Sequence, residues 1–275
     1  MNLDLMMLAE MAADKLHFMH QQISFPRNFE GLTYPCYSPN TSPKYACKLR
    51  LSEQETRLAY ILCLEQIMRE NGVVLQYSIE TPTVMSYTGF SPKQTPVILP
   101  RNSESGQAGK CGSSSGQVDM SIYIPSIANA CELMIKDMSL SEAINSMYMA
   151  VEEEPFIQYD PPAVNIEFKH GASNPLSIRK DVLKLMCENP VGVFVHSFVD
   201  NPKSRTGQST LQSITGKYIE ARSFAMNSIA CYNAKGNMTQ LSPGKEVYVF
   251  LLGLDPDGSS APSVECYRLS NWQRV

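Results

Sequence analysis

The apolar run from Val191 to Val199 constrains the fold more strongly than any other part of the sequence. Its nine letters, VGVFVHSFV, are almost all apolar, and a run of this kind is typical of a strand buried on both faces of a sheet. A helix is predicted directly before it, because Asn174 suits the N-cap, Pro175 suits the first turn, and the helical pattern continues to about Cys187. Another helix is predicted over 209–226. A buried strand between helices indicates an α/β fold.

Two other segments alternate apolar and polar residues with the two-residue period of a strand. In 118–124 (VDMSIYI) the alternation puts Asp119 on the polar face, and in 164–169 (VNIEFK) it puts Glu167 and Lys169 there. Further strands are predicted at 73–79 and 246–254. Strands that alternate with helices predict the α/β class.

The domain organisation follows from the length and from the order of these segments. The chain has 275 residues, which is the upper limit of a single large domain. Residues 51–275 are predicted to form this domain, and residues 1–50 to form an N-terminal helix and an irregular extension packed on the core. The stretch at about 126–162 separates two predicted strands and is expected to be a helical insertion.

A strong helix is predicted from Glu53 to about Glu70. Ser52 and Glu55 match the S-x-x-E capping box at its start, and Asn71-Gly72 supplies a stop at its end. One face of this helix is expected to pack into the core; that face carries Leu58, Ile61, Leu62, Glu65 and Met68.

The charge of the chain excludes a nucleic-acid binder that is held by net positive charge. Acidic residues number 27 against 23 basic ones, so the net charge is −4, and only 18% of residues are charged, against roughly 25% in an average domain. The distribution is uneven. Residues 163–222 contain eight basic and five acidic residues, a balance of +3, which leaves −7 for the rest of the chain.

The N-terminus and the cysteines predict a cytoplasmic protein. Asp4 stands where a signal peptide would carry positive charge, and Glu10 and Asp14 interrupt the apolar run that follows. No stretch reaches 18 apolar residues, so no membrane span is expected. The eight cysteines are scattered without a C-x-x-C pair, which argues against a disulfide framework and a zinc site.

The polar faces of the two alternating strands carry the residues with the most informative chemistry. Glu167 and Lys169 are neighbours on one face, about 7 Å apart along the strand, and Asp119 lies on the polar face of another predicted strand. Two carboxylates and a lysine that converge can bind a hard divalent cation and leave the lysine beside an attacking water. This combination of groups is suited to phosphodiester hydrolysis.

At these residues the sequence resembles the PD-(D/E)xK, or restriction-endonuclease-like, nuclease superfamily. The matching pieces are Asp119 in VDMSIYI, the E-x-K of VNIEFKHG, the helix SIRKDVLKL and the strand VGVFVHSFV. The resemblance covers roughly 53–199 and implies a restriction-endonuclease-like core, with a mixed central sheet flanked by helices. Val118 stands where many members have a proline, and residues 126–162 must loop out between the motif strands.

The resemblance also implies a role for each matching residue and a metal cofactor, Mg²⁺ or Mn²⁺. Asp119 and Glu167 would be metal ligands, the backbone carbonyl of Phe168 would be a further ligand, and Lys169 would be the catalytic lysine. Members often carry an acidic residue on the first helix, and Glu55 is the candidate here, with Glu65 as a substitute. The expected activity is a metal-dependent endonuclease that hydrolyses phosphodiester bonds, with DNA favoured over RNA as the partner.

Basic residues near the motif are expected to contact the nucleic-acid backbone. They follow the E-x-K strand, occupy the next helix, or lie after the buried strand; the candidates are His170, Arg179, Lys180, Lys184, Lys203 and Arg205. No membrane partner is expected, and both a homodimer and a protein partner stay open.

Several simpler interpretations compete with these assignments. Glu167 and Lys169 are also compatible with a solvated strand face, and the basic residues with a solvated helix face. The capping box alone explains Glu55, and His196 fits a core histidine with satisfied hydrogen bonds. The alternative function is a catalytically silent scaffold of the same fold that binds nucleic acid or a protein partner.

Overall fold

The computed structural model describes most of the predicted domain and the N-terminal helix. The described residues are 2–24, 51–72, 75–88, 96–100, 116–123, 132–135, 138–139, 162–188, 190–200, 210–236, 240–241, 245–256 and 258–275. They contain four helices: α1 (Leu5–Ser24), α2 (Glu53–Asn71), α4 (Pro175–Cys187) and α5 (Thr210–Ala234). None of these helices is long and apolar enough to cross a membrane.

A mixed sheet of seven strands forms the centre of the described structure. Its strand order is β12-β11-β10-β9-β8-β5-β2. Strands β8, β9 and β10 run parallel to one another, whereas β5 is antiparallel to β8 and β2 is antiparallel to β5. The strands are β2 (Gln76–Pro82), β5 (Gln117–Tyr123), β8 (Val164–His170), β9 (Val191–Val199), β10 (Val247–Leu254), β11 (Ser263–Arg268) and β12 (Gln273–Arg274). The α/β class with a mixed sheet is therefore confirmed.

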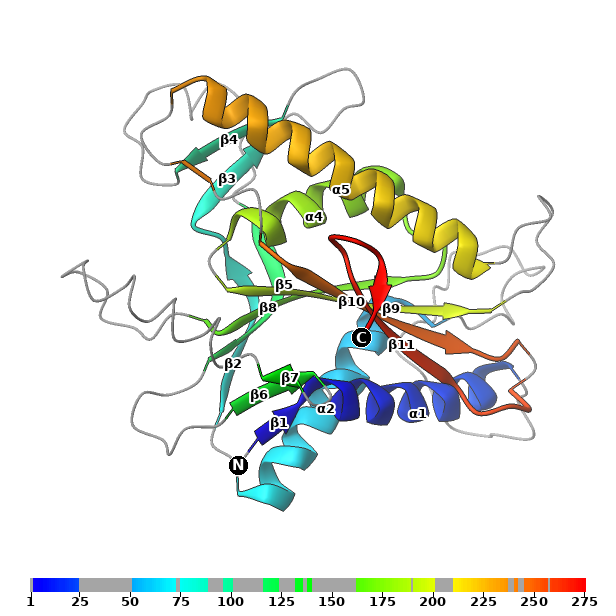
Figure 1. Ribbon diagram of the computed structural model, residues 1–275. Coiled ribbons are helices and arrows are strands. Elements are labelled where there is room, and N and C mark those ends of the chain that lie inside the picture. Colours follow the sequence, from blue (N-terminus) through cyan, green and yellow to red (C-terminus); the bar gives the residue numbers. More distant parts are fainter. Residues whose placement is uncertain are drawn as a thin grey trace, which may run out of the picture.

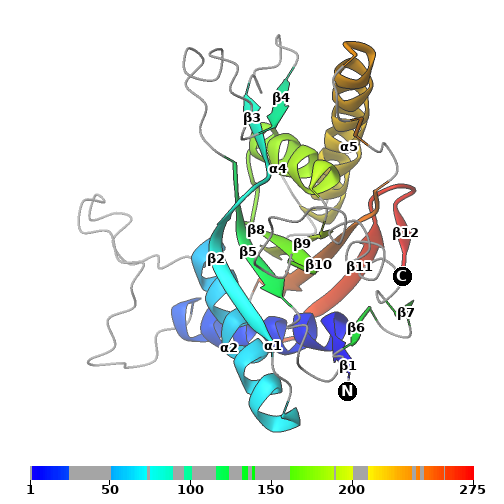
Figure 2. The ribbon, with the colours of Figure 1, turned by 90° about the vertical axis from the view of Figure 1, so that its left-hand side faces the viewer.

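Helices cover both faces of this sheet, as Figures 1 and 2 show. Helices α4 and α5 pack on one face, while α1 and α2 pack on the other. Strand β9 is buried along its whole length up to Phe198 because it lies between β8 and β10 with helices on both sides. The prediction that the apolar run 191–199 forms a strand buried on both faces is therefore confirmed.

Local signals at the ends of the helices agree with the structure. Ser52 caps α2, and the Glu55 side chain accepts hydrogen bonds from Ser52 in return, so the predicted capping box is present. Gly72 ends α2 in the left-handed conformation at φ 61°. Asn174 caps α4, with its side chain accepting a 2.9 Å hydrogen bond from the backbone N–H of Leu176.

The prediction of the buried face of α2 is wrong at Leu58 and Leu62, which are 46% and 42% exposed. Ile61 and Met68 of the same predicted face do pack against the core, partly buried. The helix is instead rotated so that Tyr60 and Leu64 point into the core, together with Ala59, Cys63 and Ile67. This helix has apolar residues on more than one side, so helical spacing alone does not identify the side that meets the sheet.

The prediction of helices in the insertion at 126–162 is also wrong for the residues described there. These form the short strands β6 (Glu132–Ile135) and β7 (Met138–Ser139). Strand β6 pairs in parallel with β1 (Asn2–Asp4), which precedes α1. A partner strand about 130 residues away in the chain leaves no trace in local periodicity. The extension expected at 25–50 and the rest of the insertion lie outside the described residues.

Two further strands, β3 (Met85–Thr88) and β4 (Val97–Pro100), pair as an antiparallel ribbon beside α4. The buried Glu188, which follows α4, accepts hydrogen bonds from the backbone of Val84 and Met85 and from the hydroxyl of Tyr87. These bonds attach the ribbon to the C-terminal end of α4.

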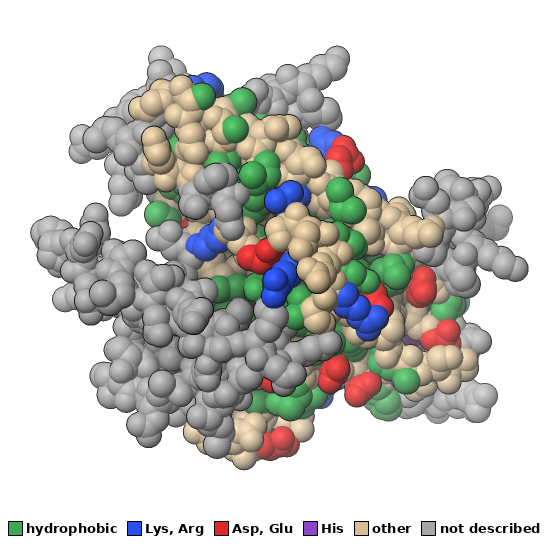
Figure 3. All heavy atoms as spheres, viewed as in Figure 1, with side chains coloured by type: hydrophobic (Ala, Val, Ile, Leu, Met, Phe, Trp, Pro, Cys, Tyr) green, Lys and Arg blue, Asp and Glu red, His purple; other side chains and the backbone are tan. Residues whose placement is uncertain are grey.

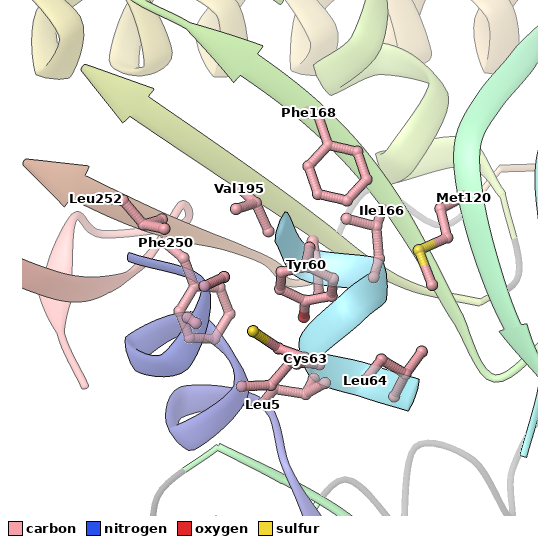
Figure 4. Close-up of a cluster of buried hydrophobic side chains, with 14 of the residues drawn as sticks. Leu5, Tyr60, Cys63, Leu64, Met120, Ile166, Phe168, Val195, Phe250 and Leu252 are labelled. Atoms are coloured by element: carbon pink, nitrogen blue, oxygen red, sulfur yellow. The ribbon is translucent and has the colours of Figure 1, made fainter. Parts of the chain in front are cut away.

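The core between α1, α2 and the sheet contains a buried polar atom. Figure 4 shows Tyr60 of α2 pointing toward the sheet, close to Phe168 and Ile166 of β8. The rings of Tyr60 and Phe168 meet edge to face at 5.5 Å. The Tyr60 hydroxyl is buried without a hydrogen-bond partner among the described residues. Burial without a partner is unfavourable for a hydroxyl.

Replacing Tyr60 with phenylalanine is therefore expected to raise the free energy of unfolding by about 1 kcal/mol, measured by urea denaturation. The matched control is Tyr218→Phe. Tyr218 is equally buried but its hydroxyl is hydrogen-bonded to His196 at 2.9 Å, so this substitution is expected to lower the free energy of unfolding by about 1–2 kcal/mol. Equal effects of both substitutions would contradict the difference in hydrogen bonding.

Candidate functional site

The polar residues of β5 and β8 meet at the face of the sheet that α4 covers. Strand alternation sends Ile166 and Phe168 toward α1 and α2, and Glu167 and Lys169 toward α4. Asp119 of the neighbouring strand accepts a 2.8 Å hydrogen bond through Oδ2 from the backbone N–H of Phe168. The three residues predicted as a site from the sequence are therefore on adjacent strands, with Asp119 bonded to the residue between Glu167 and Lys169.

Helix α4 adds two charged residues that the sequence analysis did not assign to the site in these roles. Asp181 and Lys184 are one helical turn apart and pair at 2.8 Å between Asp181 Oδ1 and Lys184 Nζ. Lys169 Nζ lies 2.9 Å from Asp181 Oδ2 and 3.8 Å from Glu167 Oε2, and Lys184 Nζ contacts Glu167 Oε1. Each lysine thus contacts both carboxylates through different oxygens. We call these four residues the buried charge cluster.

Burial sets the electrostatics of this cluster. Its four residues are between 2% and 5% exposed. Burial raises the pKa of the Glu167 carboxyl well above its ordinary value, and the nearby Asp181 raises it further. Burial also acts to raise the pKa of Asp181, but the ion pairs with Lys184 and Lys169 are stronger and lower it overall. The same ion pairs keep the pKa of both lysines above the ordinary lysine value despite their burial.

The simpler interpretation of Glu167 and Lys169 as a solvated strand face is wrong, because α4 covers both. Lys184 is equally unsuited to a solvated helix face, since it is 3% exposed. A sequence signal for Asp181 and Lys184 did exist. Both fall among the buried apolar residues of α4, next to Val182 and Leu185, and charges within an apolar stripe require buried partners.

Two more carboxylates border the cluster. Glu53 Oε2, at the start of α2, lies 3.6 Å from Lys169 Nζ, and burial raises the pKa of Glu53. Asp119 is close enough to both Glu53 and Glu167 to disfavour their ionised forms. This region therefore contains four carboxylates and two ammonium groups, which leaves a formal surplus of two negative charges.

A divalent cation carries the two positive charges that would neutralise this surplus, so the charge of the site can be compared with that of a metal ion. Carboxylate and carbonyl oxygens are the ligands that Mg²⁺ and Mn²⁺ prefer, and the Phe168 carbonyl oxygen is at the same place, where it accepts a 2.9 Å hydrogen bond from Lys169 Nζ. The donor chemistry and the charge fit one divalent ion. Within the part of the chain that the structure describes, however, no three His, Cys, Asp or Glu residues are already arranged around a common metal position.

The structure gives Glu55 a different place from the one predicted for it. Its carboxylate accepts hydrogen bonds from Ser52 in the capping box, and Glu53 is the acidic residue of α2 that reaches Lys169. Glu65, the substitute, accepts a 2.8 Å hydrogen bond from the Tyr77 hydroxyl. Glu53 is the first residue of α2, and this position brings it to the C-terminal end of β8, near Lys169. The capping box turns Glu55 back toward Ser52.

The basic residues predicted to contact nucleic acid have different environments. Arg179 pairs with Glu220 and lies 5.3 Å over the ring of Phe224, so α5 already engages it. Lys180 is half-buried on the same helix. Lys203 and Arg205 lie outside the described residues. On the face shown in Figure 3, basic side chains lie among acidic ones rather than forming a continuous basic surface.

His170 belongs to a hydrogen-bond chain on the other side of β8. Its Nδ1 lies 2.8 Å from the Ser197 hydroxyl, which contacts the Thr56 hydroxyl at 2.5 Å. Thr56 donates to the Ser52 carbonyl at 3.2 Å. Because the Thr56 hydroxyl gives its hydrogen to Ser52, the Ser197 hydroxyl must donate to Thr56. Ser197 then has no hydrogen left for His170, so Nδ1 of His170 is the donor in their hydrogen bond. Burial lowers the pKa of His170 to about 4, so His170 is neutral near pH 7 and does not provide a positive charge for phosphate.

His196 is a core histidine with both ring nitrogens bonded, as predicted. Nε2 donates to the Gly171 carbonyl at 2.9 Å, since a carbonyl oxygen only accepts, and Nδ1 accepts from the Tyr218 hydroxyl at 2.9 Å. The ring is fully buried. Burial lowers the pKa of His196 to about 3.

Comparisons with known proteins supply no relative of this chain. No protein-family model, curated protein or solved structure matches it. The site must therefore be interpreted from its own geometry.

The buried neutral histidine predicts a loss of stability in acid. Unfolded histidine has a pKa near 6.5, so below that pH the unfolded chain binds a proton that folded His196 excludes until about pH 3. Between pH 7 and pH 5 this residue alone is expected to reduce the free energy of unfolding by about 2 kcal/mol.

The measurement is urea denaturation at the two pH values for the native chain and for His196→Gln, whose pH dependence is expected to be weaker by the same amount. In NMR spectra of the native chain, the His196 ring signals are expected to stay constant between pH 8 and pH 5. A midpoint above pH 5 would contradict the assignment.

Proposed function

We propose that this chain is a divalent-metal-dependent nuclease that hydrolyses phosphodiester bonds, with DNA favoured over RNA, on a restriction-endonuclease-like core. The observation that carries the proposal is the convergence of Asp119, Glu167 and Lys169 on the adjacent strands β5 and β8. The sequence motif that resembles the PD-(D/E)xK nucleases thus coincides with a buried, charged site.

The order and directions of the elements around the site support this proposal. Helix α2, strands β2, β5 and β8, helix α4 and strand β9 follow one another in the order that the resemblance implies, with short strands between them. The first three of these strands are antiparallel neighbours, and β9 is parallel to β8. The helix between β8 and β9 contributes Asp181 and Lys184 to the site.

In this proposal Asp119, Glu167 and the Phe168 carbonyl would hold the metal. A bound Mg²⁺ or Mn²⁺ supplies Lewis-acid stabilisation of a phosphate and lowers the pKa of water. Lys169 donates hydrogen bonds from Nζ, and its fixed ammonium can orient an attacking oxygen or stabilise developing negative charge. Asp181 holds that ammonium at 2.9 Å, which limits the positions that Lys169 can adopt.

The proposal predicts that Asp119→Asn and Lys169→Met each reduce Mg²⁺- or Mn²⁺-dependent cleavage of duplex DNA by more than about a hundredfold. Asparagine can still accept the hydrogen bond from the Phe168 N–H, so Asp119→Asn is expected to stay folded. The assay is steady-state cleavage of a labelled duplex, with circular dichroism to confirm folding and a chelator to remove the metal.

The matched controls are Asp14→Asn and Lys235→Met. Both residues are exposed, on α1 and after α5, and neither substitution is expected to change the rate. Cleavage at the native rate by both site variants would refute the proposed function.

The same geometry favours a second candidate, a catalytically silent scaffold that binds nucleic acid or a protein. The specific observation is that Lys184 and Lys169 already neutralise Glu167 and Asp181. The four charges of the buried charge cluster balance one another, so the cluster can persist without metal. Absence of Mn²⁺ binding at millimolar concentration, measured by calorimetry, together with absence of cleavage would favour the scaffold.

The nuclease, and the scaffold where it binds nucleic acid, would use phosphate contacts whose strength depends on salt. If Lys180 contacts a phosphate, Lys180→Ala is expected to reduce the slope of log affinity against log salt concentration by about 0.9. The measurement is fluorescence anisotropy of a labelled duplex in Ca²⁺, at several salt concentrations. Lys235→Ala is the control with an unchanged slope, and equal slopes in all three proteins would exclude Lys180 from the interface.

A further inference from the structure

The ammonium group of Lys184 is held like a bound cation. Three oxygens surround it, one for each of its hydrogens: Glu167 Oε1, Asp181 Oδ1 at 2.8 Å and the backbone carbonyl oxygen of Gln117 at 2.5 Å. The residue is 3% exposed. Two carboxylates and one carbonyl are also the donor types that hard divalent cations use.

This position brings Lys184 into conflict with a metal ion at Glu167. Glu167 has two oxygens; Oε1 is in contact with Lys184, and Oε2 faces Lys169 at 3.8 Å. An ion that binds Glu167 through Oε1 must displace the contact with Lys184, and an ion that binds through Oε2 must tolerate the positive charges of both lysines. Charges at such distances interact strongly in a buried site.

We propose that Lys184 is a built-in cation that competes with divalent metal for Glu167 and thereby sets the metal affinity of the site. The inference rests on the proposed function in one respect, the assignment of Glu167 as a metal ligand. Lys184 is a positioning residue in this account. Without metal it holds Glu167 and Asp181 in place; with metal it retains Asp181 and the Gln117 carbonyl, which its long, flexible side chain can still reach.

The competition distinguishes the two lysines of the cluster. Lys169 donates to the Phe168 carbonyl and lies nearest Asp181, with Glu167 at the longer distance of 3.8 Å. Lys184 has its direct contact on Glu167 itself. Removal of the Lys184 charge therefore frees Oε1 of Glu167 for a metal ion, whereas removal of the Lys169 charge would leave the contact on Oε1 in place.

The experiment measures Mn²⁺ binding by isothermal calorimetry, with the electron paramagnetic resonance signal of free Mn²⁺ as a second readout. Lys184→Met is expected to bind Mn²⁺ at least about tenfold more tightly than the native chain. Adding Asp119→Asn is expected to abolish the gain. Lys235→Met, at an exposed lysine after α5 and outside the cluster, is expected to leave the affinity unchanged.

A second comparison covers the case in which Lys184→Met fails to fold because two buried carboxylates lose their partner. Asp181→Asn with Lys184→Met removes one charge of each sign, and this double variant is expected to bind Mn²⁺ more tightly than Asp181→Asn alone. A merely structural role for Lys184 would lower the melting temperature and leave the affinity unchanged.

The outcomes separate this inference from the proposed function. Equal or weaker Mn²⁺ binding after removal of Lys184, or no binding in any variant, overturns the inference even if the native chain cleaves DNA. A gain in binding that depends on Asp119 supports it even if the native chain binds no metal and cleaves nothing, in which case the nuclease proposal fails alone.

Discussion

The ion pairs between β8 and α4 are the interactions on which the rest of the site depends. Glu167 and Lys169 of the strand and Asp181 and Lys184 of the helix form a closed arrangement in which every charge has two opposite neighbours. Burying a single one of these charges without partners would be strongly unfavourable. The cluster therefore requires α4 to lie over β8 in one register, and this requirement fixes the positions of the groups proposed to do chemistry.

The two faces of β8 differ in what they contribute. One face packs Ile166 and Phe168 against α2 and stabilises the domain through apolar burial. The other face carries the charged cluster, whose net contribution to stability is small because desolvation offsets attraction. Strongly perturbed pKa values such as that of Glu167 are concentrated at functional sites. Lys184 adds a specific consequence, since the cation that completes the cluster also occupies an oxygen of Glu167 that a metal would use.

Local patterns predicted those parts of the structure that depend on neighbouring residues. The capping box at Ser52 and the N-cap at Asn174 are confirmed, because a cap involves atoms within three residues. The face of α2 that packs on the sheet was predicted wrongly at Leu58 and Leu62, because this helix has apolar residues on more than one side. Glu53 rather than Glu55 reaches Lys169, which depends on where the first turn of α2 meets the sheet.

The sequence by itself determined the α/β class, the burial of β9 and the placement of Asp119, Glu167 and Lys169 on polar strand faces, since strand alternation and apolar runs are local properties. Only the tertiary structure decided that α4 covers these polar faces and that Asp181 and Lys184 pair with them. The physical reason is that a charge in a sequence looks the same whether water or another charge will surround it. The packing of the helix on the sheet decides between the two.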